Sequence, residues 1–300
     1  MIHPAPRHAH KDPATDLRIQ SDWVREFGPK LWITLGIDDP DASIRRAEAL
    51  MKVGKVGGFI VDPLIGFSKA NARMIKMIKR EFGKGALVMA GNVCVPEGVL
   101  YLIEAGADCI KIGMGPGAAC TTRGVTGVGV PQFTAVLECA AMANRYGIPS
   151  IADGGIEGPR AVALALAAGA WAVMSGKLFT QCKESPAEKR RARKNPDEKR
   201  KKRSGEEPPQ FEAHYMGLAS AAYQEWRGRK SSRTVPEGVD FWTPVKYTVD
   251  SLMDTILGGL KSTMSQCAVW NIAEFRKKKP VVRFYVADHA SVRESGTRVA

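Results

Sequence analysis

Short apolar runs alternate with longer amphipathic stretches along residues 31–175. The short runs have the length and composition of buried strands, and the longer stretches repeat their apolar positions at the helical period. Asp39, Pro40 and Asp41 suit a helix start, because a carboxylate accepts from free amides and proline has none to satisfy. Predicted strands are 31–37, 58–62, 86–93, 109–115, 150–153 and 172–175, and predicted helices are 39–53, 68–82, 96–105, 131–145 and 159–168.

Strands that alternate with helices through short glycine-rich turns form right-handed βαβ units around a parallel sheet. An open doubly wound sheet and a (β/α)₈ barrel both fit the six strands. Polar residues or glycines follow nearly every strand, namely Asp62, Asn92, Gly113, Asp153 and Gly176. An open sheet gathers such residues only where its strand order reverses, whereas a barrel gathers them from all its strands at one end. The pattern therefore favours an α/β fold of the (β/α)₈ TIM-barrel type.

The chain divides into five segments on this interpretation. Residues 1–30 form a polar N-terminal arm, 31–182 hold barrel strands three to eight, 183–210 form a basic mobile loop, 211–248 form an active-site flap, and 249–300 form a C-terminal helix and tail. The first two β/α units then have no counterpart, which leaves two open sheet edges and an apolar interior. We expect either a separate polypeptide that supplies this quarter of the barrel or a degenerate, truncated product.

Composition narrows the class of protein. Hydrophobic residues make up 44% and charged residues 25%, which excludes disorder as the overall state. No apolar stretch suits a membrane span or a signal peptide, so we expect a cytoplasmic protein without membrane contact. The cysteines have neither metal-like nor CxxC spacing and are expected to be reduced thiols: Cys94, Cys109, Cys120, Cys139, Cys182 and Cys267.

The net charge of +13 is concentrated in one place. Residues 183–203 hold eleven basic and four acidic side chains, so 11 − 4 = +7 lies in this segment. A solvated, mobile loop is the favoured interpretation, and a surface that attracts phosphates or nucleic acid is the alternative. Because the charge is local, nucleic acid is not the expected partner.

The residues from Gly113 to Gln132 carry the most informative motif, Gly-Met-Gly-Pro-Gly-Ala-Ala-Cys-Thr-Thr-Arg-Gly-Val-Thr-Gly-Val-Gly-Val-Pro-Gln. Its glycines allow tight turns that direct carbonyls or amides at a ligand. A lone cysteine is usually a small buried hydrophobe. Cys120, however, lies in a polar loop beside Thr122 and Arg123, where a thiolate is accessible and stabilised. We therefore take Cys120 as the candidate nucleophile.

This loop closely resembles the catalytic loop of the IMP dehydrogenase/GMP reductase family. The resemblance runs from about residue 31 to residue 296 and includes further motifs in the same order. These are Ala90-Gly-Asn-Val, Glu104-Ala-Gly-Ala-Asp, Ile151-Ala-Asp-Gly-Gly, Val173-Met-Ser-Gly, Glu184-Ser-Pro, Tyr215-Met-Gly, Val235-Pro-Glu-Gly and Leu257-Gly-Gly-Leu-Lys-Ser.

The resemblance implies roles for individual residues. Cys120 is the nucleophile that attacks C2 of the purine base, while Thr122 and Glu237 manage the proton and the small molecule that leaves or attacks. The residues implied for the purine nucleotide monophosphate are Asp153, Gly155, Gly176, Tyr215 and Gly217, and those for the NADPH or NAD cofactor are Asp62, Asn92 and Gly113. Gly115, Gly117 and Cys120 offer carbonyls to potassium, with Glu294 from a neighbouring subunit of a homo-tetramer. Asp153 as a helix cap, Asp62 as a turn residue and Glu294 as plain tail are the structural alternatives.

Both family reactions use the same cysteine adduct, so the flap decides between them. The flap has no Arg-Tyr pair of the kind that activates water in the dehydrogenases, which favours GMP reductase, converting GMP to IMP and ammonia with NADPH. Residues 235–238 and 293–295 are dehydrogenase-like, so oxidation of IMP to XMP with NAD is the alternative. A non-catalytic nucleotide-binding or scaffold subunit that needs a partner chain is the third hypothesis.

Overall fold

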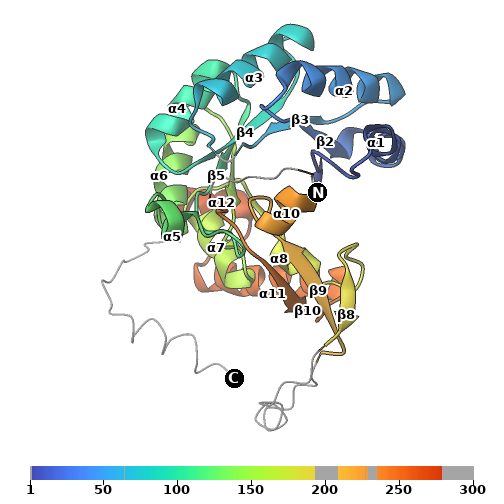
Figure 1. Cartoon of the computed structure of the whole chain (residues 1–300). Coiled ribbons are helices and arrows are strands. Elements are labelled where there is room, and N and C mark those ends of the chain that lie inside the picture. The colour runs from blue at the N-terminus through green and yellow to red at the C-terminus, as the bar shows by residue number, and fades with distance from the viewer. Residues whose placement is uncertain (1, 64, 193–208, 227, 229–234, 279–300) are drawn as a thin grey trace.

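The computed structural model describes residues 2–63, 65–192, 209–226, 228 and 235–278. Seven parallel strands form one sheet in chain order and curl into an incomplete barrel (Figure 1). The strands are β1 (His3–Ala5), β2 (Leu31–Thr34), β3 (Gly58–Val61), β4 (Val88–Val93), β5 (Cys109–Ile112), β6 (Ser150–Asp153) and β7 (Ala172–Met174). Within the described residues β1 and β7 have no further strand partner, so the barrel stays open between them.

Helices follow the strands on the outside of the sheet (Figure 1). They are α1 (Pro13–Phe27), α2 (Pro40–Val53), α3 (Lys69–Glu81), α4 (Pro96–Ala105), α5 (Thr122–Thr126), α6 (Gln132–Arg145), α7 (Pro159–Ala167) and α8 (Lys177–Thr180), with a short 3₁₀ turn at Gly28–Lys30. Prolines occupy the first turns of α1, α2, α4 and α7, and the Asp39 carboxylate accepts from the Ala42 amide at 2.9 Å. The strands and helices predicted between residues 31 and 175 are confirmed.

The first 30 residues differ from the expected polar arm. Their strand β1 pairs in parallel with β2, and α1 packs against α2. Polar composition hid this unit because α1 buries hydrogen-bonded polar groups as well as Val24. The Gln20 amide donates to Asp16 at 2.9 Å, and Arg46 of α2 donates to Gln20 at 2.7 Å. The described part of the chain therefore supplies seven barrel strands rather than six.

A second sheet lies apart from the barrel strands and is antiparallel. Its order is β10 (Asp240–Pro244), β9 (Phe211–Met216), β8 (Lys189–Arg191) (Figure 1). The first residues of the expected basic loop thus form β8, where Arg190 pairs with Glu212 at 3.1 Å and stacks on Trp242. Residues 193–208 of that loop lie outside the described residues. The remaining helices are α10 (Ala221–Trp226), α11 (Val249–Gln266) and α12 (Ile272–Lys278).

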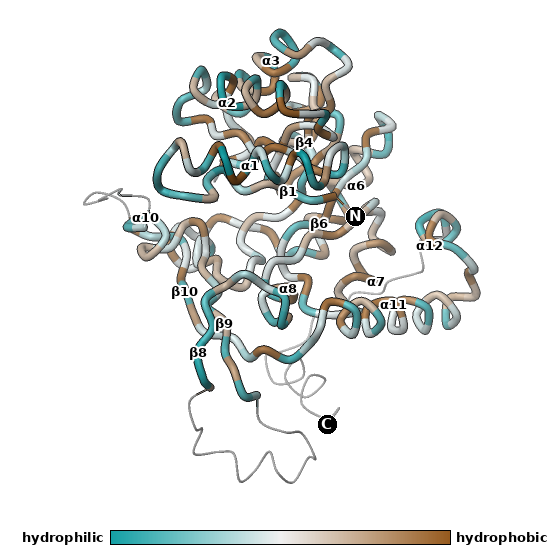
Figure 2. The backbone as a smooth tube through the Cα atoms, turned by 90° about the vertical axis from the view of Figure 1, so that its right-hand side faces the viewer, coloured by the Kyte–Doolittle hydropathy of each residue, from teal (hydrophilic) through white to brown (hydrophobic). Residues whose placement is uncertain are grey.

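Two apolar layers hold the barrel together. The larger lies between the sheet and its helices, and the smaller fills the inside of the curl with Ile60, Met89 and Cys109, flanked by Trp32 and Ile151. Figure 2 colours much of the strands as hydrophobic and β8 as hydrophilic. Gly58 makes room for Trp32, since an added Cβ would lie 2.8 Å from a ring carbon. No helix in the described residues is long and apolar enough to span a membrane.

Candidate active site

The loop that follows β5 is fastened to a segment more than a hundred residues later in the chain. The Thr121 amide donates to the Glu237 carbonyl at 2.9 Å, and the Val239 amide donates to the Ala119 carbonyl at 2.9 Å. Cys120 faces Gly238 in the resulting antiparallel bridge. We call residues 119–121 and 237–239 the clamp. The clamp holds the backbone of Glu237 next to the loop that carries Cys120, and these two residues are predicted to belong to one catalytic group.

Cys120 and Thr122 are in direct contact. The Cys120 Sγ lies 3.2 Å from the Thr122 Oγ1, and Thr122 is buried at the start of α5 while Cys120 is only half-buried. The Cys120 amide donates to the Gly117 carbonyl at 2.9 Å, which turns the chain back just before the thiol. A thiol that is reachable and next to a hydroxyl can act as a nucleophile with a group at hand to relay a proton.

Gly176, Tyr215 and Gly217, which were predicted to bind the nucleotide, make close contacts with their neighbours. A Cβ on Gly217 would lie 2.9 Å from the Ala119 Cβ, so β9 approaches the clamp closely. A Cβ on Gly176 would lie 2.7 Å from the Tyr215 hydroxyl, so the end of β7 meets β9. Burial, together with the negative charge of Asp153, raises the pKa of Tyr215. Gly217 therefore lies against the thiol loop, and Gly176 lies against Tyr215.

Hydrogen bonds from Gln132 join the end of the loop between β5 and α6 to the ends of β5 and β6. Gln132 donates through Nε2 to the Ile112 carbonyl at 3.0 Å and to the Asp153 carbonyl at 3.1 Å. Gly113 has φ +144°, and a Cβ there would lie 2.0 Å from the Asp153 carbonyl oxygen. Glycine is required at this position for both reasons. Gly155, also at positive φ, follows Asp153 and faces Pro116 of the same loop.

A cluster of charged side chains lies at the carboxyl ends of the strands. Its central residue, Lys111, was not predicted from the sequence. Lys111 of β5 is 2% exposed, and its Nζ lies 2.7 Å from Asp62 and 3.0 Å from Asp153. Asn92 Nδ2 donates to the same Asp153 oxygen at 2.9 Å. Arg7, from the segment after β1, donates to the Asp62 carbonyl at 2.8 Å and faces its carboxylate at 3.5 Å. A charged residue inside the apolar run Cys-Ile-Lys-Ile was the signal that could have found Lys111.

The charges in this cluster support one another. Burial by itself lowers the pKa of Lys111, but the carboxylates of Asp153 and Asp62 outweigh it and the net shift is upward. Burial by itself raises the pKa of Asp62, but Lys111 and Arg7 outweigh it and the net shift is downward. Both partners are therefore charged across the physiological range, which makes the cluster a fixed ionic element.

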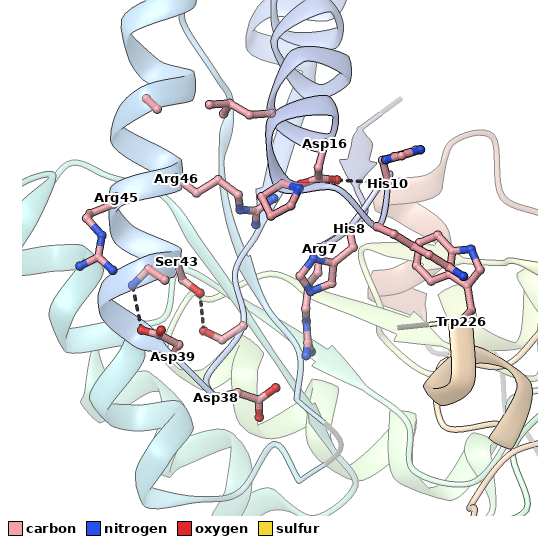
Figure 3. A pocket seen from close by; sticks show the side chains of 16 residues that line it. Arg7, His8, His10, Asp16, Asp38, Asp39, Ser43, Arg45, Arg46 and Trp226 are labelled. Carbon is pink, nitrogen blue, oxygen red and sulfur yellow. Dashed lines mark hydrogen bonds between the residues drawn. The ribbon is translucent and has the colours of Figure 1, made fainter. Parts of the chain in front are cut away.

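A cavity of about 600 Å³ adjoins the cluster and shares Arg7 with it (Figure 3). It opens between the start of α1, the first turns of α2 and the end of α10, and Figure 3 places Trp226 across it from Arg45. Its charged and aromatic lining residues are Arg7, His8, His10, Lys11, Asp16, Asp38, Asp39, Arg45, Arg46 and Trp226. Cys120 does not line this cavity, so the cavity is separate from the thiol.

The residues expected for a cation are only partly observed. Gly115 and Gly117 lie in the loop, but the Gly117 carbonyl already accepts from the Cys120 amide. Gly115 packs against the side chain of Arg123, which itself donates to the Met114 and Val130 carbonyls. Glu294 lies outside the described residues, among which no group of three His, Cys, Asp or Glu side chains suits a metal ion.

The chain is an incomplete parallel β/α barrel with carboxylates at the carboxyl ends of its strands. Its clamped loop presents a thiol beside a hydroxyl, an arrangement suited to nucleophilic chemistry. The family model described as "IMP dehydrogenase / GMP reductase domain" matches residues 24–298. The chain therefore belongs to the IMP dehydrogenase/GMP reductase family of NAD(P)-dependent oxidoreductases.

Similar proteins bear both family names. The inosine-5'-monophosphate dehydrogenase of Chlorobaculum parvum is 39% identical over 285 residues, which are 91% of this chain and 54% of that protein. That of Aquifex aeolicus is 37% identical and is matched over 85% of this chain and 50% of its own length. A crystal structure of a GMP reductase from Trypanosoma brucei in complex with guanosine 5'-monophosphate gives a TM-score of 0.75 at 30% identity, covering 90% of this chain and 52% of that one. The chain thus spans about half the length of the relatives it matches.

Proposed function

We propose that this chain carries the active site of a purine-nucleotide oxidoreductase that acts on C2 of the base, and that its reaction is oxidation of IMP to XMP. The observation that carries the proposal is the contact of Cys120 Sγ with Thr122 Oγ1 at 3.2 Å in a loop clamped to Glu237. The choice of IMP as substrate is supported by the name inosine-5'-monophosphate dehydrogenase of the two bacterial relatives.

In this proposal the Cys120 thiolate attacks C2 and forms a C–S bond, and the hydride on C2 leaves with its electron pair. A nicotinamide dinucleotide held beside Asp62, Asn92 and Gly113 would supply the hydride acceptor. Water then attacks C2, the C–S bond breaks, and the thiolate is regenerated. Thr122 and Glu237 would manage the proton from that water: the Thr122 hydroxyl lies 3.2 Å from the thiol, and the Glu237 carbonyl accepts from the neighbouring Thr121 amide. The balance is IMP, NAD⁺ and water giving XMP, NADH and a proton.

The remaining residues bind and orient the two ligands. Asp153 holds the ribose hydroxyls of the nucleotide, with Gly155, Gly176, Tyr215 and Gly217 around its phosphate. The cofactor fits beside Asp62, Asn92 and Gly113, because the buried Oδ1 of Asn92 has no hydrogen-bond partner among the described residues and can accept from a carboxamide. The cavity that shares Arg7 with Asp62 adds four cationic side chains for the phosphates of a dinucleotide, among them Arg45 and Arg46.

We also propose that the protein binds a monovalent cation and forms a homo-tetramer, neither of which takes part in the reaction steps above. The Gly115, Gly117 and Cys120 carbonyls would hold the ion, with Glu294 from a neighbouring subunit. Since the Gly117 carbonyl is engaged within the loop, the ion binds only if that carbonyl also uses its second lone pair. Potassium dependence of turnover and the native mass of the protein test these two points.

Reduction of GMP to IMP and ammonia with NADPH is the second candidate. It is favoured by the flap sequence, which has no Arg-Tyr pair between Tyr215 and Glu237, and by the likeness to the Trypanosoma brucei GMP reductase. In that reaction Cys120 would form the C–S bond as the amino group leaves C2 as ammonia with a proton from the Thr122 and Glu237 pair, and a bound NADPH would supply the hydride that replaces Cys120 on C2.

The test compares the absorbance of reduced nicotinamide with IMP and NAD against that with GMP and NADPH. It is run on the chain alone and on the chain co-expressed with the N-terminal barrel segment of the Chlorobaculum parvum relative. NADH formation from IMP supports the proposal, and NADPH consumption with GMP supports the second candidate. Nucleotide binding without turnover in either form leaves the non-catalytic subunit as the function.

A further inference from the structure

Lys111 is the one cationic side chain that is buried among the described residues. A buried charge is costly unless it is paired and hydrogen-bonded, so its partners determine whether β5 can tolerate it. Those partners are Asp62 at the end of β3 and Asp153 at the end of β6, at 2.7 and 3.0 Å. Since β4 and β5 separate these strands in the sheet, one ammonium joins carboxylates that do not lie on neighbouring strands.

We propose that Lys111 is a positioning residue that serves both ligands at once, holding Asp153 for the nucleotide and Asp62 for the nicotinamide cofactor. The inference rests on the proposed function for the roles of the two carboxylates. An ammonium has three donors, and two of them are committed to these acids. Because both ligands depend on one cation, nucleotide affinity and cofactor affinity are linked through Lys111, and by reciprocity each ligand affects the other equally.

The charges around Lys111 balance. The cations Lys111 and Arg7 face the carboxylates Asp62 and Asp153, and Asn92 adds a neutral donor to Asp153. Arg7 reaches Asp62, so Lys111 is the cation that Asp153 shares. Removal of the Lys111 charge leaves two partly buried acids that repel each other. Removal of the Asp62 charge as well relieves that repulsion, although it deletes a cofactor-side residue.

The experiment uses the full chain and titration calorimetry with IMP at neutral pH. Lys111→Met is expected to weaken IMP binding by at least about tenfold, because it leaves the partly buried carboxylate of Asp153 without its cationic partner. The double variant Lys111→Met with Asp62→Asn is expected to recover most of that loss. Lys111→Arg keeps the charge but adds volume in a buried place, so it is expected to retain more IMP affinity than Lys111→Met. Melting temperatures confirm that each variant is folded, and Lys111→Gln replaces Lys111→Met if the latter does not fold.

If Asp62→Asn restores nucleotide binding to the Lys111→Met variant, Lys111 acts through its charge on both acids. A residue that only filled space would show no such rescue. The inference is overturned if Lys111→Met binds IMP like wild type, or if the double variant binds no better than the single one. These outcomes leave the proposed function standing, because wild type then still binds IMP. Wild type that binds neither IMP nor GMP, both alone and in complex with the co-expressed N-terminal barrel segment, overturns the proposed function and this inference with it.

Discussion

At the scale of single residues, surroundings distinguish one thiol from the others. Burial raises the pKa of Cys109 and of Cys139 to about 12, so these two thiols stay protonated near neutral pH and serve as small core residues. Cys120 is half-buried in a glycine-rich loop beside the Thr122 hydroxyl. Cys94 and Cys267 are also half-buried, so the glycine-rich loop and the Thr122 hydroxyl, rather than exposure alone, make Cys120 the reactive candidate.

Glu237 is expected to act on the water or ammonia at C2 and not on the formation of the adduct. Glu237→Gln should slow turnover by roughly 10²–10⁴-fold, the range of a positioned acid–base group, while the initial burst of hydride transfer persists. Stopped-flow absorbance separates the burst from the steady state. Steady-state rates equal to wild type would show that the proton is managed elsewhere.

Asp62 links the ionic cluster to pH-dependent stability. Its pKa is lowered in the folded chain, so its ion pairs stabilise the fold above the unfolded value of about 3.9 and are lost as pH falls through the lower folded value. Asp62→Asn should therefore reduce the free energy of unfolding by about 2 kcal/mol at pH 7. The difference from wild type should shrink in strongly acidic buffer. Denaturant titrations across this range measure it, and a gap that widens in acid would contradict the assignment.

At the scale of elements, the sequence predicts the helices and strands whose apolar positions are regularly spaced. The strands at Leu31–Thr34 and Cys109–Ile112 follow from their apolar runs, and Asp39 marks the start of α2 through its capped amide. Helix α1 was missed because its buried face includes Asp16 and Gln20, whose mutual hydrogen bond no composition rule records. Lys111 was missed likewise, since its two acids come from distant strands. Buried polar networks depend on partners that are distant in the sequence, so neither the spacing of apolar residues nor the composition predicts them.

The clamp is the element-level device that joins the thiol loop to Glu237. Gly217→Val is expected to displace it, because an added Cβ would lie 2.9 Å from the Ala119 Cβ and 3.0 Å from the Val239 carbonyl. Turnover should fall by at least about tenfold, since small misplacements of reacting groups are costly. Gly258→Ala in α11 is the control, as its Cβ would meet nothing within 4 Å. Equal activity of both variants would show that the clamp does not position the site.

At the scale of the whole molecule, the open barrel is the main structural feature. The described strands run from β1 to β7 without closing, and Trp32 and Ile151 are partly exposed at the sides of the interior layer. Much of the interior is nonetheless filled, since Ile60 and Met89 are at most 3% exposed. The expected open groove is thus smaller than six strands would have left, because β1 and α1 occupy part of the gap.

Completion of the barrel is expected to strengthen nucleotide binding. We propose that a further barrel segment covers the gap between β1 and β7 and adds phosphate contacts. Co-expression with the N-terminal barrel segment of the Chlorobaculum parvum relative should yield a stable complex with at least about tenfold higher affinity for IMP. Calorimetry on the purified complex and on the chain alone compares the two. Equal affinities would mean that the chain is competent with seven strands.

The central claim is that Cys120 forms the covalent bond to C2, and the rate of NADH formation from IMP by Cys120→Ser tests it most directly. The measurement is made in whichever form of the protein is active as wild type, with IMP affinity determined on the same sample. A hydroxyl near neutral pH offers almost no oxyanion, so turnover should fall below about 1% of wild type. IMP affinity should stay within about threefold, because Asp153 and Tyr215 are unchanged. Turnover above a few per cent of wild type would contradict the claim.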